Sequence, residues 1–290
     1  MNTNDFRYFL KLIELRNFRA TARYFGVSQP TISYAIKRLE AFYGMQLIQR
    51  QRGQTMIITL AGWRLNEHLK RVVRELDLAK IDIESLDNPK VKFGIPPMIG
   101  NVYFSSLAES LKAERILSKI ELVEDGSQEI LEQLKKGRID LALIGTRQPI
   151  NDVALSTIPI TKRTISIVVS EHDELAQLDQ VDFADLANEP FVIFNSGFVH
   201  KQIFDELCAT TEVYPQILQQ TNDLSILKNM IAENIGISLL ADVAISPFDG
   251  IKNIPLINSV PDFYISLVYR RNYQLTKVEQ QLIEITKQIK

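Results

Sequence analysis

Residues 29 to 38 carry hydrogen-bonding and basic side chains at a spacing that places them together on a helix. At about 100° of rotation per residue, one side would hold Pro30, Tyr34, Lys37 and Arg38, flanked by Thr31 and Ser33, with Gln29 in the first turn. The opposite side would be apolar, with Ile32, Ala35, Ile36, Leu39 and Tyr43. Amide, hydroxyl and basic groups can bind base edges and phosphates. The polar side therefore predicts a surface that reads DNA.

Two shorter helices are expected before this one. Thr3 or Asn4 can cap the first helix, and the second is expected at about residues 18–25 and ends at Gly26. Ser28 is a suitable cap for the third helix, and Pro30 in its first turn is tolerated. A helix, a tight glycine turn and a second helix form the helix-turn-helix arrangement, whose second helix enters the major groove.

A basic hairpin is expected after the third helix. Short strands at about 47–49 and 56–58 flank a turn that contains Arg50, Arg52 and Gly53. Placed there, the hairpin would be a wing whose Arg50 and Arg52 contact phosphates or the minor groove. Taken singly, each piece also fits an amphipathic helix with a solvated face or an ordinary exposed hairpin. Their order along the chain favours DNA binding.

The charge distribution agrees with this interpretation. Residues 1–64 contain ten Lys and Arg against three Asp and Glu, whereas the whole chain of 290 residues has a net charge of −2. The basic segment has a net charge of +7 and the remainder −9. A basic head on an acidic body predicts that only the head meets a polyanion.

The first 62 residues resemble the N-terminal domain of LysR-type transcriptional regulators. The resemblance lies in "FRATARYFGVSQPTISYAIKRLE", "YGMQLIQR" and "ITLAG" at their present separations. Three pairs depart from the family pattern, namely Arg16-Asn17, Thr21-Ala22 and Leu47-Ile48. None of them removes a side chain that the DNA contact needs. The resemblance implies a winged helix-turn-helix domain, which we place at residues 1–58.

A long helix is expected from the cap Thr59 to about Leu86, with Trp63 packed between head and helix. Apolar residues repeat along it at separations of four and three, namely Leu65, Leu69, Val72, Leu76, Ala79, Ile83 and Leu86. Such a heptad stripe predicts a partner helix, although burial against the chain's own body is the alternative. The resemblance implies a dimerisation helix. Residues 59–90 are therefore assigned to a linker helix and the hinge "DNPK".

The remaining residues, 91–290, alternate expected strands and helices. Strands are expected at "VKFGI", "KIELVE", "IDLALIG", "TISIVVS", "PFVIF", "IGISLLA" and "FYISLVYR". Strand-helix-strand repeats predict an α/β fold with a mostly parallel sheet. The segment resembles the two-lobed type 2 periplasmic-binding-protein fold, the family's effector domain, with "FYISLVYR" and the last helix returning to the first lobe. Asn234 stands where the family has glycine, and asparagine tolerates the left-handed conformation.

Several polar residues follow strands, where ligands of open α/β folds bind. We expect helix starts or turns at "PPMIGN", at Ser127, at "FNSGFVHK" and at Asn222. The candidate effector contacts are Pro97, Met98, Asn101, Ser127, Ser196, Phe198, His200 and Asn222. Each Ser or Asn is equally well explained as a helix cap, so their convergence carries the prediction.

The effector class comes from resemblance alone. "VKFGIPPMIGNVYF" resembles the regulators of malolactic fermentation in lactic acid bacteria. That resemblance implies L-malate or another small carboxylate, with an aromatic or amino-acid effector as the alternative. Four residues could balance a carboxylate's charge, namely Arg147, Arg163, His200 and Lys201.

Catalytic and metal-binding patterns are absent from the sequence. There is no GxSxG, GxGxxG or GxxxxGK[ST], and His68, His172 and His200 lack ligand partners at helical spacing. Cofactors are not expected. An enzyme, such as a small-molecule transferase with a DNA-binding head, is the alternative function. Cys208 is the only cysteine and is expected to be a buried small hydrophobe.

The sequence also predicts where the protein works. No apolar run approaches the roughly 20 residues that span a bilayer, and the N-terminus lacks the plan of a signal peptide. A cytoplasmic protein is expected. Its predicted partners are double-stranded operator DNA, a small-molecule effector, a second copy in a dimer or tetramer, and RNA polymerase. Activation and repression are equally compatible with these residues.

Overall fold

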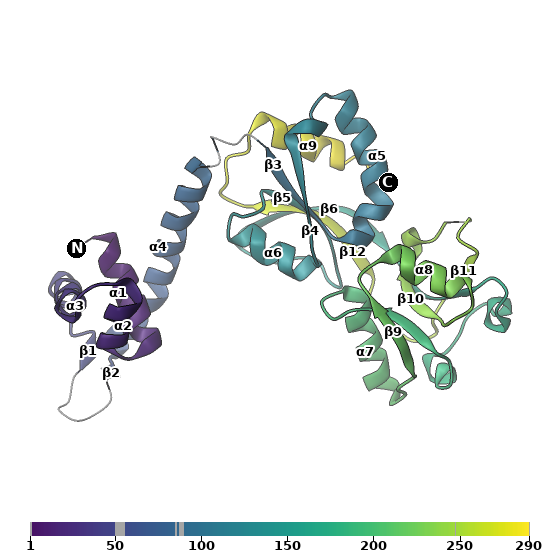
Figure 1. Ribbon diagram of the computed structural model, residues 1–290, viewed down its shortest axis with the longest axis horizontal. Helices are drawn as coiled ribbons and strands as arrows, with labels where there is room; N and C mark the ends of the chain where they lie inside the picture. Colours follow the sequence, from purple (N-terminus) through teal and green to yellow (C-terminus); the bar gives the residue numbers. More distant parts are fainter. Residues whose placement is uncertain (1, 50–55, 85, 87–89, 247, 290) are drawn as a thin grey trace. The chain divides into compact units, whose positions relative to one another are not determined.

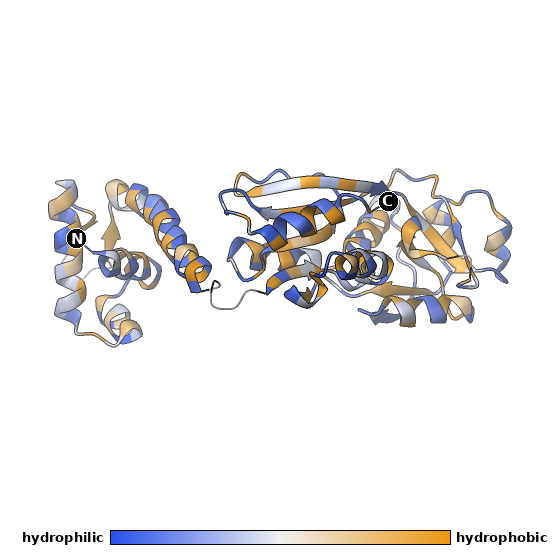
Figure 2. Cartoon of the chain, turned by 90° about the horizontal axis from the view of Figure 1, so that it is seen from above, coloured by the Kyte–Doolittle hydropathy of each residue, from blue (hydrophilic) through white to orange (hydrophobic). Residues whose placement is uncertain are grey.

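The computed structural model describes residues 2–49, 56–84, 86, 90–246 and 248–289. The chain divides into two compact units, Met1–Asp87 and Asn88–Lys290, each of which is described by itself below. Strands of the second unit are coloured largely as hydrophobic (Figure 2). No helix among the described residues has the length and apolar character needed to cross a membrane.

The first unit contains three helices, a small hairpin and a long helix (Figure 1). Its elements are α1 (Thr3–Leu15), α2 (Phe18–Phe25), α3 (Gln29–Tyr43), β1 (Ile48–Gln49), β2 (Ile57–Ile58) and α4 (Leu60–Glu84). The predicted cap of α1 was wrong by one or two residues, because Asn2 forms a capping box with Asp5. Ser28 caps α3 and Gly26 ends α2 with φ +64°, as predicted.

The core of this unit includes the start of the long helix. Phe9, Leu12, Ile32 and Leu39 are buried together with Leu65 and Leu69 of α4. Thr59 caps α4 by accepting a hydrogen bond from the Gly62 amide. Gly62 has no room for a Cβ, which would lie 2.4 Å from the Leu47 carbonyl oxygen. The glycine of "ITLAG" therefore lets α4 contact the hairpin closely. By packing, α4 belongs to the head and does not form a separate domain.

The heptad stripe is divided by this packing. Leu65 and Leu69 are buried within the chain, whereas Val72, Leu76 and Ile83 are 42, 39 and 68% exposed. Burial against the chain's own body therefore applies to the first part of α4, and pairing with a partner helix stays a prediction for the exposed part. The predicted hinge "DNPK" lies mostly outside the described residues.

The second unit has two lobes. The first contains a five-stranded sheet of order β4-β3-β5-β12-β6. Its strands are β3 (Val91–Ile95), β4 (Ile120–Glu124), β5 (Leu141–Thr146), β6 (Leu155–Arg163) and β12 (Phe263–Arg270). Its helices are α5 (Pro97–Ala113), α6 (Ser127–Lys135), α9 (Lys277–Thr286) and the short η2 (Leu117–Lys119). The last strand and helix return to this lobe, as predicted.

The second lobe is built around two small sheets of order β10-β7-β11 and β8-β9. Its strands are β7 (Ile165–Ser170), β8 (Phe191–Phe194), β9 (Ile217–Thr221), β10 (Ser238–Ala241) and β11 (Ile251–Ile254). Its helices are α7 (Val199–Thr211), α8 (Leu224–Ala232), η3 (Glu174–Gln177), η4 (Phe183–Leu186) and η5 (Asp242–Ala244). Asn234 has φ +53°, which confirms the left-handed conformation expected there.

The prediction of a mostly parallel sheet was wrong. β3 is parallel to β4 and β5, but β12 is antiparallel to β5 and β6, and β7 is antiparallel to β10 and β11. The chain leaves the first lobe and returns to it, so the returning strand runs opposite to its neighbours. β6, β9 and β11 were not predicted, because β6 is mostly half-exposed, β9 is mostly exposed and β11 has only four residues.

Candidate functional site

The two faces of α3 lie as predicted. Ile32, Ala35, Ile36 and Leu39 are buried, and Gln29, Pro30, Tyr34 and Lys37 are exposed. Tyr34 is 61% exposed, and the Lys37 ammonium lies 5.9 Å from its ring centre. Tyr43 is the exception on the apolar side, because it lies near the helix end and is 43% exposed. Thr31 and Ser33 are half-buried, and the Thr31 hydroxyl lies 2.8 Å from that of the cap Ser28.

Arg38 has an intramolecular partner that the sequence did not predict. Its Nε donates to Asp5 Oδ2 at 3.0 Å and its NH2 to Asp5 Oδ1 at 2.5 Å. Asp5 is fully buried, whereas the Arg38 side chain is 46% exposed. Burial raises the pKa of Asp5, but hydrogen bonds from Arg38 and the Asn2 amide outweigh it and leave the pKa below 3.8. Arg38 therefore holds α3 against α1.

The wing is positioned by another residue of the same motif. Glu40 Oε1 accepts hydrogen bonds from the amides of Leu47 and Ile48, at 2.9 and 3.2 Å. This contact fixes the start of the hairpin, whose two strands pair antiparallel. Arg50 and Arg52, the predicted wing contacts, lie outside the described residues, as does Gly53.

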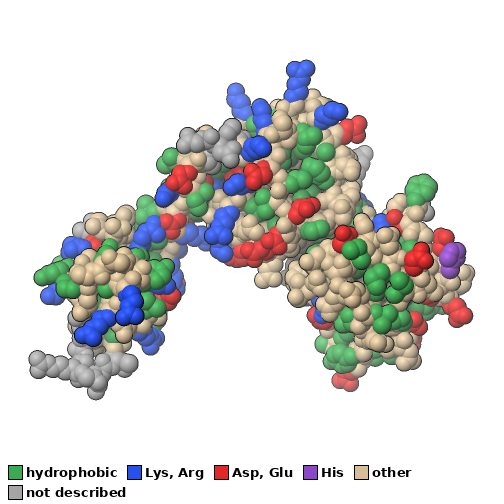
Figure 3. Space-filling view, viewed as in Figure 1, with side chains coloured by type: hydrophobic (Ala, Val, Ile, Leu, Met, Phe, Trp, Pro, Cys, Tyr) green, Lys and Arg blue, Asp and Glu red, His purple; other side chains and the backbone are tan. Residues whose placement is uncertain are grey.

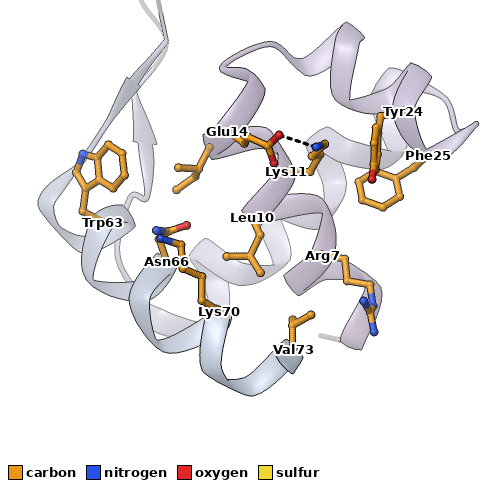
Figure 4. Close-up of a pocket in the computed structure, with 11 residues that line it drawn as sticks. Arg7, Leu10, Lys11, Glu14, Tyr24, Phe25, Trp63, Asn66, Lys70 and Val73 are labelled. Carbon is orange, nitrogen blue, oxygen red and sulfur yellow. Dashed lines mark hydrogen bonds and ion pairs between the residues drawn. The ribbon is translucent and has the colours of Figure 1, made fainter. Parts of the chain in front are cut away.

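A groove of about 570 Å³ lies on the head beside α1 and α4 (Figure 4). Trp63 lines it at the start of α4 and is 42% exposed, so it is only partly packed between head and helix. The Lys11 ammonium pairs with Glu14 at 2.6 Å and lies 4.2 Å from the centre of the Tyr24 ring. Arg7 of α1 pairs with Asp77 of α4. The Arg7–Asp77 pair therefore fixes α4 against α1, and the contact of Lys11 with Tyr24 joins α1 to α2.

In the second unit, two cavities gather most of the predicted effector residues. The larger, of about 490 Å³, is lined by Pro97, Ser196, Phe198 and Asn222 together with residues of β4 and α6. The smaller is lined by Met98, Ser127, Phe198 and His200 among others, and Phe198 borders both. Asn101 lines neither, because it lies in the second turn of α5. Seven of the eight predicted residues therefore converge.

The local reasons for this convergence differ from those predicted. The segment "PPMIGN" is the start of α5 and not a turn, since Pro96 is its cap. Ser127 is the first residue of α6, whose cap is Gly126, and Asp223 rather than Asn222 caps α8. Asn222 instead accepts a hydrogen bond from Asn195 at 2.7 Å.

His200 is buried among aromatic rings. It is 3% exposed, and its ring centre lies 5.3 Å from those of Phe194 and Phe263. Gly145 makes room for Phe263, because a Cβ there would lie 1.9 Å from the ring. Burial lowers the pKa of His200 to about 4, so the ring is neutral at physiological pH. A neutral ring offers no positive charge to a carboxylate, so the structure gives no support to that role of His200.

The other predicted cations are engaged within the protein. Lys201 pairs with Asp205 and Arg147 with Glu206, in both cases with carboxylates of α7. Arg163 Nε donates to the Tyr103 hydroxyl at 3.3 Å. None of these three residues lines either cavity as the structure describes them.

Cys208 and the two other histidines line neither cavity as the structure describes them. Cys208 is buried, and burial raises the pKa of its thiol, in agreement with the predicted structural role. His172 is exposed, as predicted, and His68 is exposed on α4 beside Arg71. No group of three His, Cys, Asp or Glu in the described part of the chain could hold a metal ion.

Comparison with known proteins agrees with both units. Residues 3–63 match the family model described as bacterial regulatory helix-turn-helix protein, lysR family, and residues 85–289 match the LysR substrate binding domain. The malolactic fermentation system transcriptional activator of Lactococcus lactis subsp. lactis (strain IL1403) is 30% identical over 293 residues, covering 100% of this chain and 99% of that one.

Two solved structures are similar in fold. Full-length OxyR from Pseudomonas aeruginosa, a cysteine variant, has a TM-score of 0.55 at 18% identity, covering 99% of this chain and 98% of that chain. The effector binding domain of QuiR in complex with shikimate has a TM-score of 0.56 at 20% identity, covering 68% of this chain and 94% of that chain. The chain belongs to the LysR family of DNA-binding transcriptional regulators, with a helix-turn-helix head and an effector-binding domain.

Proposed function

We propose that this protein binds an operator through α3 and changes its regulatory activity when a small molecule binds in the two cavities bordered by Phe198. These two cavities are together called the cleft. The observation that carries the proposal is the two-sided α3, with Ile32 and Leu39 buried and Tyr34 and Lys37 exposed. A helix held by one face and open on the other can enter the major groove.

The DNA contacts divide into three roles. Gln29, Pro30, Thr31, Ser33, Tyr34 and Lys37 are proposed to face the bases. Arg50 and Arg52 are proposed to contact phosphate or the minor groove from the wing. Arg38, predicted as a contact, is proposed to position α3, because its guanidinium is hydrogen-bonded to Asp5.

A second copy is proposed to cover the exposed part of the α4 stripe. Val72, Leu76 and Ile83 are exposed at heptad spacing, which is the pattern of a helix that pairs with another helix. A dimer would present two α3 helices to two operator half-sites. Dimers that pair into tetramers are compatible with the same surface, and RNA polymerase is the proposed partner at the promoter.

The cleft is proposed to sense an effector without transforming it. The seven converging residues include no nucleophile paired with a base, which favours a regulator over a transferase. The relative named as a malolactic fermentation activator supports a small carboxylate such as L-malate. The charges around the cleft do not support that class, and they are considered below.

The test is thermodynamic. If effector and operator binding are coupled, operator must change effector affinity by the factor by which effector changes operator affinity. Titration calorimetry and footprinting on the full chain would measure both factors, with a panel of carboxylates, amino acids and amines. Unequal factors or turnover of the compound would contradict the proposal, and failure to bind any operator DNA would remove its DNA-binding part.

A further inference from the structure

The wall of the larger cavity is acidic. Four of its lining residues carry carboxylates, namely Glu124, Asp125, Glu129 and Glu132. The other lining residues are uncharged, and no Lys or Arg is among them as far as the structure describes the wall. A small dicarboxylate would enter against like charges, which is unfavourable.

Three of these four carboxylates have no ion pair among the described residues, and one of the three, Asp125, accepts hydrogen bonds from neutral groups only. Glu132 pairs at 3.8 Å with Lys135 and Lys136. Asp125 accepts hydrogen bonds from the Gly126 amide at 2.8 Å and from Gln133 at 3.2 Å. For Glu124 and Glu129, no ion pair occurs within the described ranges of the chain. These two side chains therefore leave negative charge directed at a cavity of about 490 Å³, a size that suits a small ligand.

The same carboxylates do not form a metal site. Within the described residues, no three acidic, His or Cys side chains are grouped closely enough to hold a metal ion. A metal ion needs several ligands at about 2.0 to 2.6 Å, whereas an ammonium group needs hydrogen-bond acceptors at longer distance. The spacing therefore favours an organic cation over a metal ion.

An independent observation indicates that a polar ligand atom belongs nearby. His200 lines the smaller cavity, of about 10 Å³, and is 3% exposed, and its Nε2 has no hydrogen-bond partner among the residues that the structure describes. An unpaired buried nitrogen costs roughly 1 to 3 kcal/mol, so such groups usually have a partner, which here can be a ligand. Phe198 borders both cavities and stacks on Phe194 at 4.7 Å, which provides an apolar surface between them.

We propose that the effector is a small organic amine whose ammonium group binds Glu124 and Glu129 and whose second polar atom hydrogen-bonds to His200 Nε2. The proposal rests on the function proposed above, in which this cleft is the sensor. The hydrocarbon part of the amine would lie against Phe198, whose ring can also attract the cation. The proposal replaces the small carboxylate that the sequence resemblance implied.

Three four-carbon probes of matched length test the charge directly. Putrescine carries two ammonium groups, succinate two carboxylates, and butanediol two hydroxyls. Titration calorimetry of the full-length protein should show putrescine binding more than about tenfold tighter than the other two, with an affinity that falls as salt is added. Aminobutanol, with one ammonium group, should bind more tightly than butanediol.

Variants locate the binding site. Glu124→Gln with Glu129→Gln should weaken putrescine binding by about tenfold or more, because each neutralised carboxylate removes a charge-assisted hydrogen bond. The matched control is Glu109→Gln with Glu114→Gln, two exposed carboxylates of the same lobe outside this cavity, which should leave the affinity unchanged. His200→Phe keeps an aromatic ring but removes Nε2, and it should also weaken putrescine binding. An unchanged thermal unfolding transition of the second unit, which carries these residues, would show that each variant is folded.

Other results would overturn the inference separately from the proposed function. Succinate binding while amines fail at millimolar concentration would exclude the amine class and leave the regulator in place. Failure of every probe would also overturn the amine proposal. If amines bind equally to the Glu124 and Glu129 variant and to the control, the site is elsewhere. Loss of operator coupling with amine binding intact would instead contradict the proposed function.

Discussion

The reading face of α3 and the wall of the cleft use polar groups in different ways. On α3, Tyr34 and Lys37 extend from one helix whose other side is buried. The cleft wall takes residues from α5, β4, α6, α7 and the loop before α8 (Figure 1), and several of its polar groups already have partners in the protein. On the helix, side-chain type and spacing predict orientation. In the cleft, the neighbours decide what each group can bind.

Charge follows the same division. The N-terminal 64 residues are basic and the remainder is acidic. Blue Lys and Arg side chains are visible on the head, and red Asp and Glu side chains are prominent on parts of the larger unit (Figure 3). A polyanion is therefore expected to meet the head, whereas the cleft lined by Glu124 and Glu129 favours a cation.

The largest expected effect is on assembly through α4. Leu76→Glu with Ile83→Glu places two carboxylates in the proposed helix pair, which costs several kcal/mol because the charges would be buried without partners. Analytical ultracentrifugation should show smaller particles whose effector unit retains its fold. Lys80→Glu is the control, since Lys80 is exposed and lies off the stripe. An unchanged assembly would mean that the exposed stripe does not hold the dimer.

The second effect separates two neighbouring cations of α3. Arg38→Ala leaves the buried Asp5 carboxylate without its guanidinium, which should lower the free energy of unfolding of the head by about 1 to 3 kcal/mol. Lys37→Ala should leave this stability unchanged and weaken operator binding. Urea unfolding followed by the fluorescence of Trp63, the single tryptophan, would measure the first effect. Equal stability of the two variants would show that the Asp5 contact is not structural.

Much of the head could be predicted because its information is local. Helical periodicity placed Ile32 and Leu39 inside and Tyr34 outside, and Ser28 and Gly26 marked helix ends through their own conformational preferences. The pairing of Arg38 with Asp5 joins residues 33 positions apart, and no local pattern reports it. The assignment of Arg38 to DNA was therefore made without its hydrogen-bond partner on α1.

The cleft shows the opposite case. Residues after the carboxyl ends of strands were expected to converge, and seven of the eight line the two cavities although the sheets are mixed. The two predicted helix caps were wrong by one residue. Gly126 rather than Ser127 caps α6, with its amide bound by Asp125, and Asp223 rather than Asn222 caps α8. Burial of His200 depends on Phe194, Phe263 and the absence of a Cβ at Gly145, so its neutral state could not be deduced from the residue type.

The third effect concerns specificity. Tyr34→Ala should reduce the preference for operator over random DNA by about tenfold, because a base contact carries sequence information. Thr31→Ala should act in the same direction, less strongly, since the Thr31 hydroxyl also contacts Ser28. Arg50→Ala and Arg52→Ala should instead weaken binding to both DNAs and reduce the salt dependence by about one unit of slope for each phosphate that the variant no longer binds. Titrations at several salt concentrations would distinguish them, and equal behaviour of all four variants would refute the division of roles.

The smallest expected effect is on stability in weak acid, where the two units should differ. Burial lowers the pKa of His200 from 6.5 to about 4, so the unfolded chain binds a proton that the folded protein excludes between these values. The stabilisation from neutral His200 is complete above pH 6.5 and is lost as pH falls toward 4; at pH 6 the loss is below about 1 kcal/mol. In the head, the pKa of Asp5 is lowered, so the stabilisation from its carboxylate is lost only as the pH falls below 3.8.

Hydrogen exchange of each unit in the full chain would test this difference. Between pH 6.5 and 4, amides of the second lobe should lose protection, whereas Trp63 fluorescence should report a stable head. His200→Phe should abolish the pH dependence of the lobe, because it keeps a ring beside Phe194 and Phe263 without a titrating nitrogen. Asp5→Asn should leave it unchanged. If both units lose stability in the same pH range in both variants, these two buried groups do not control acid sensitivity, and the contrast between head and cleft has another cause.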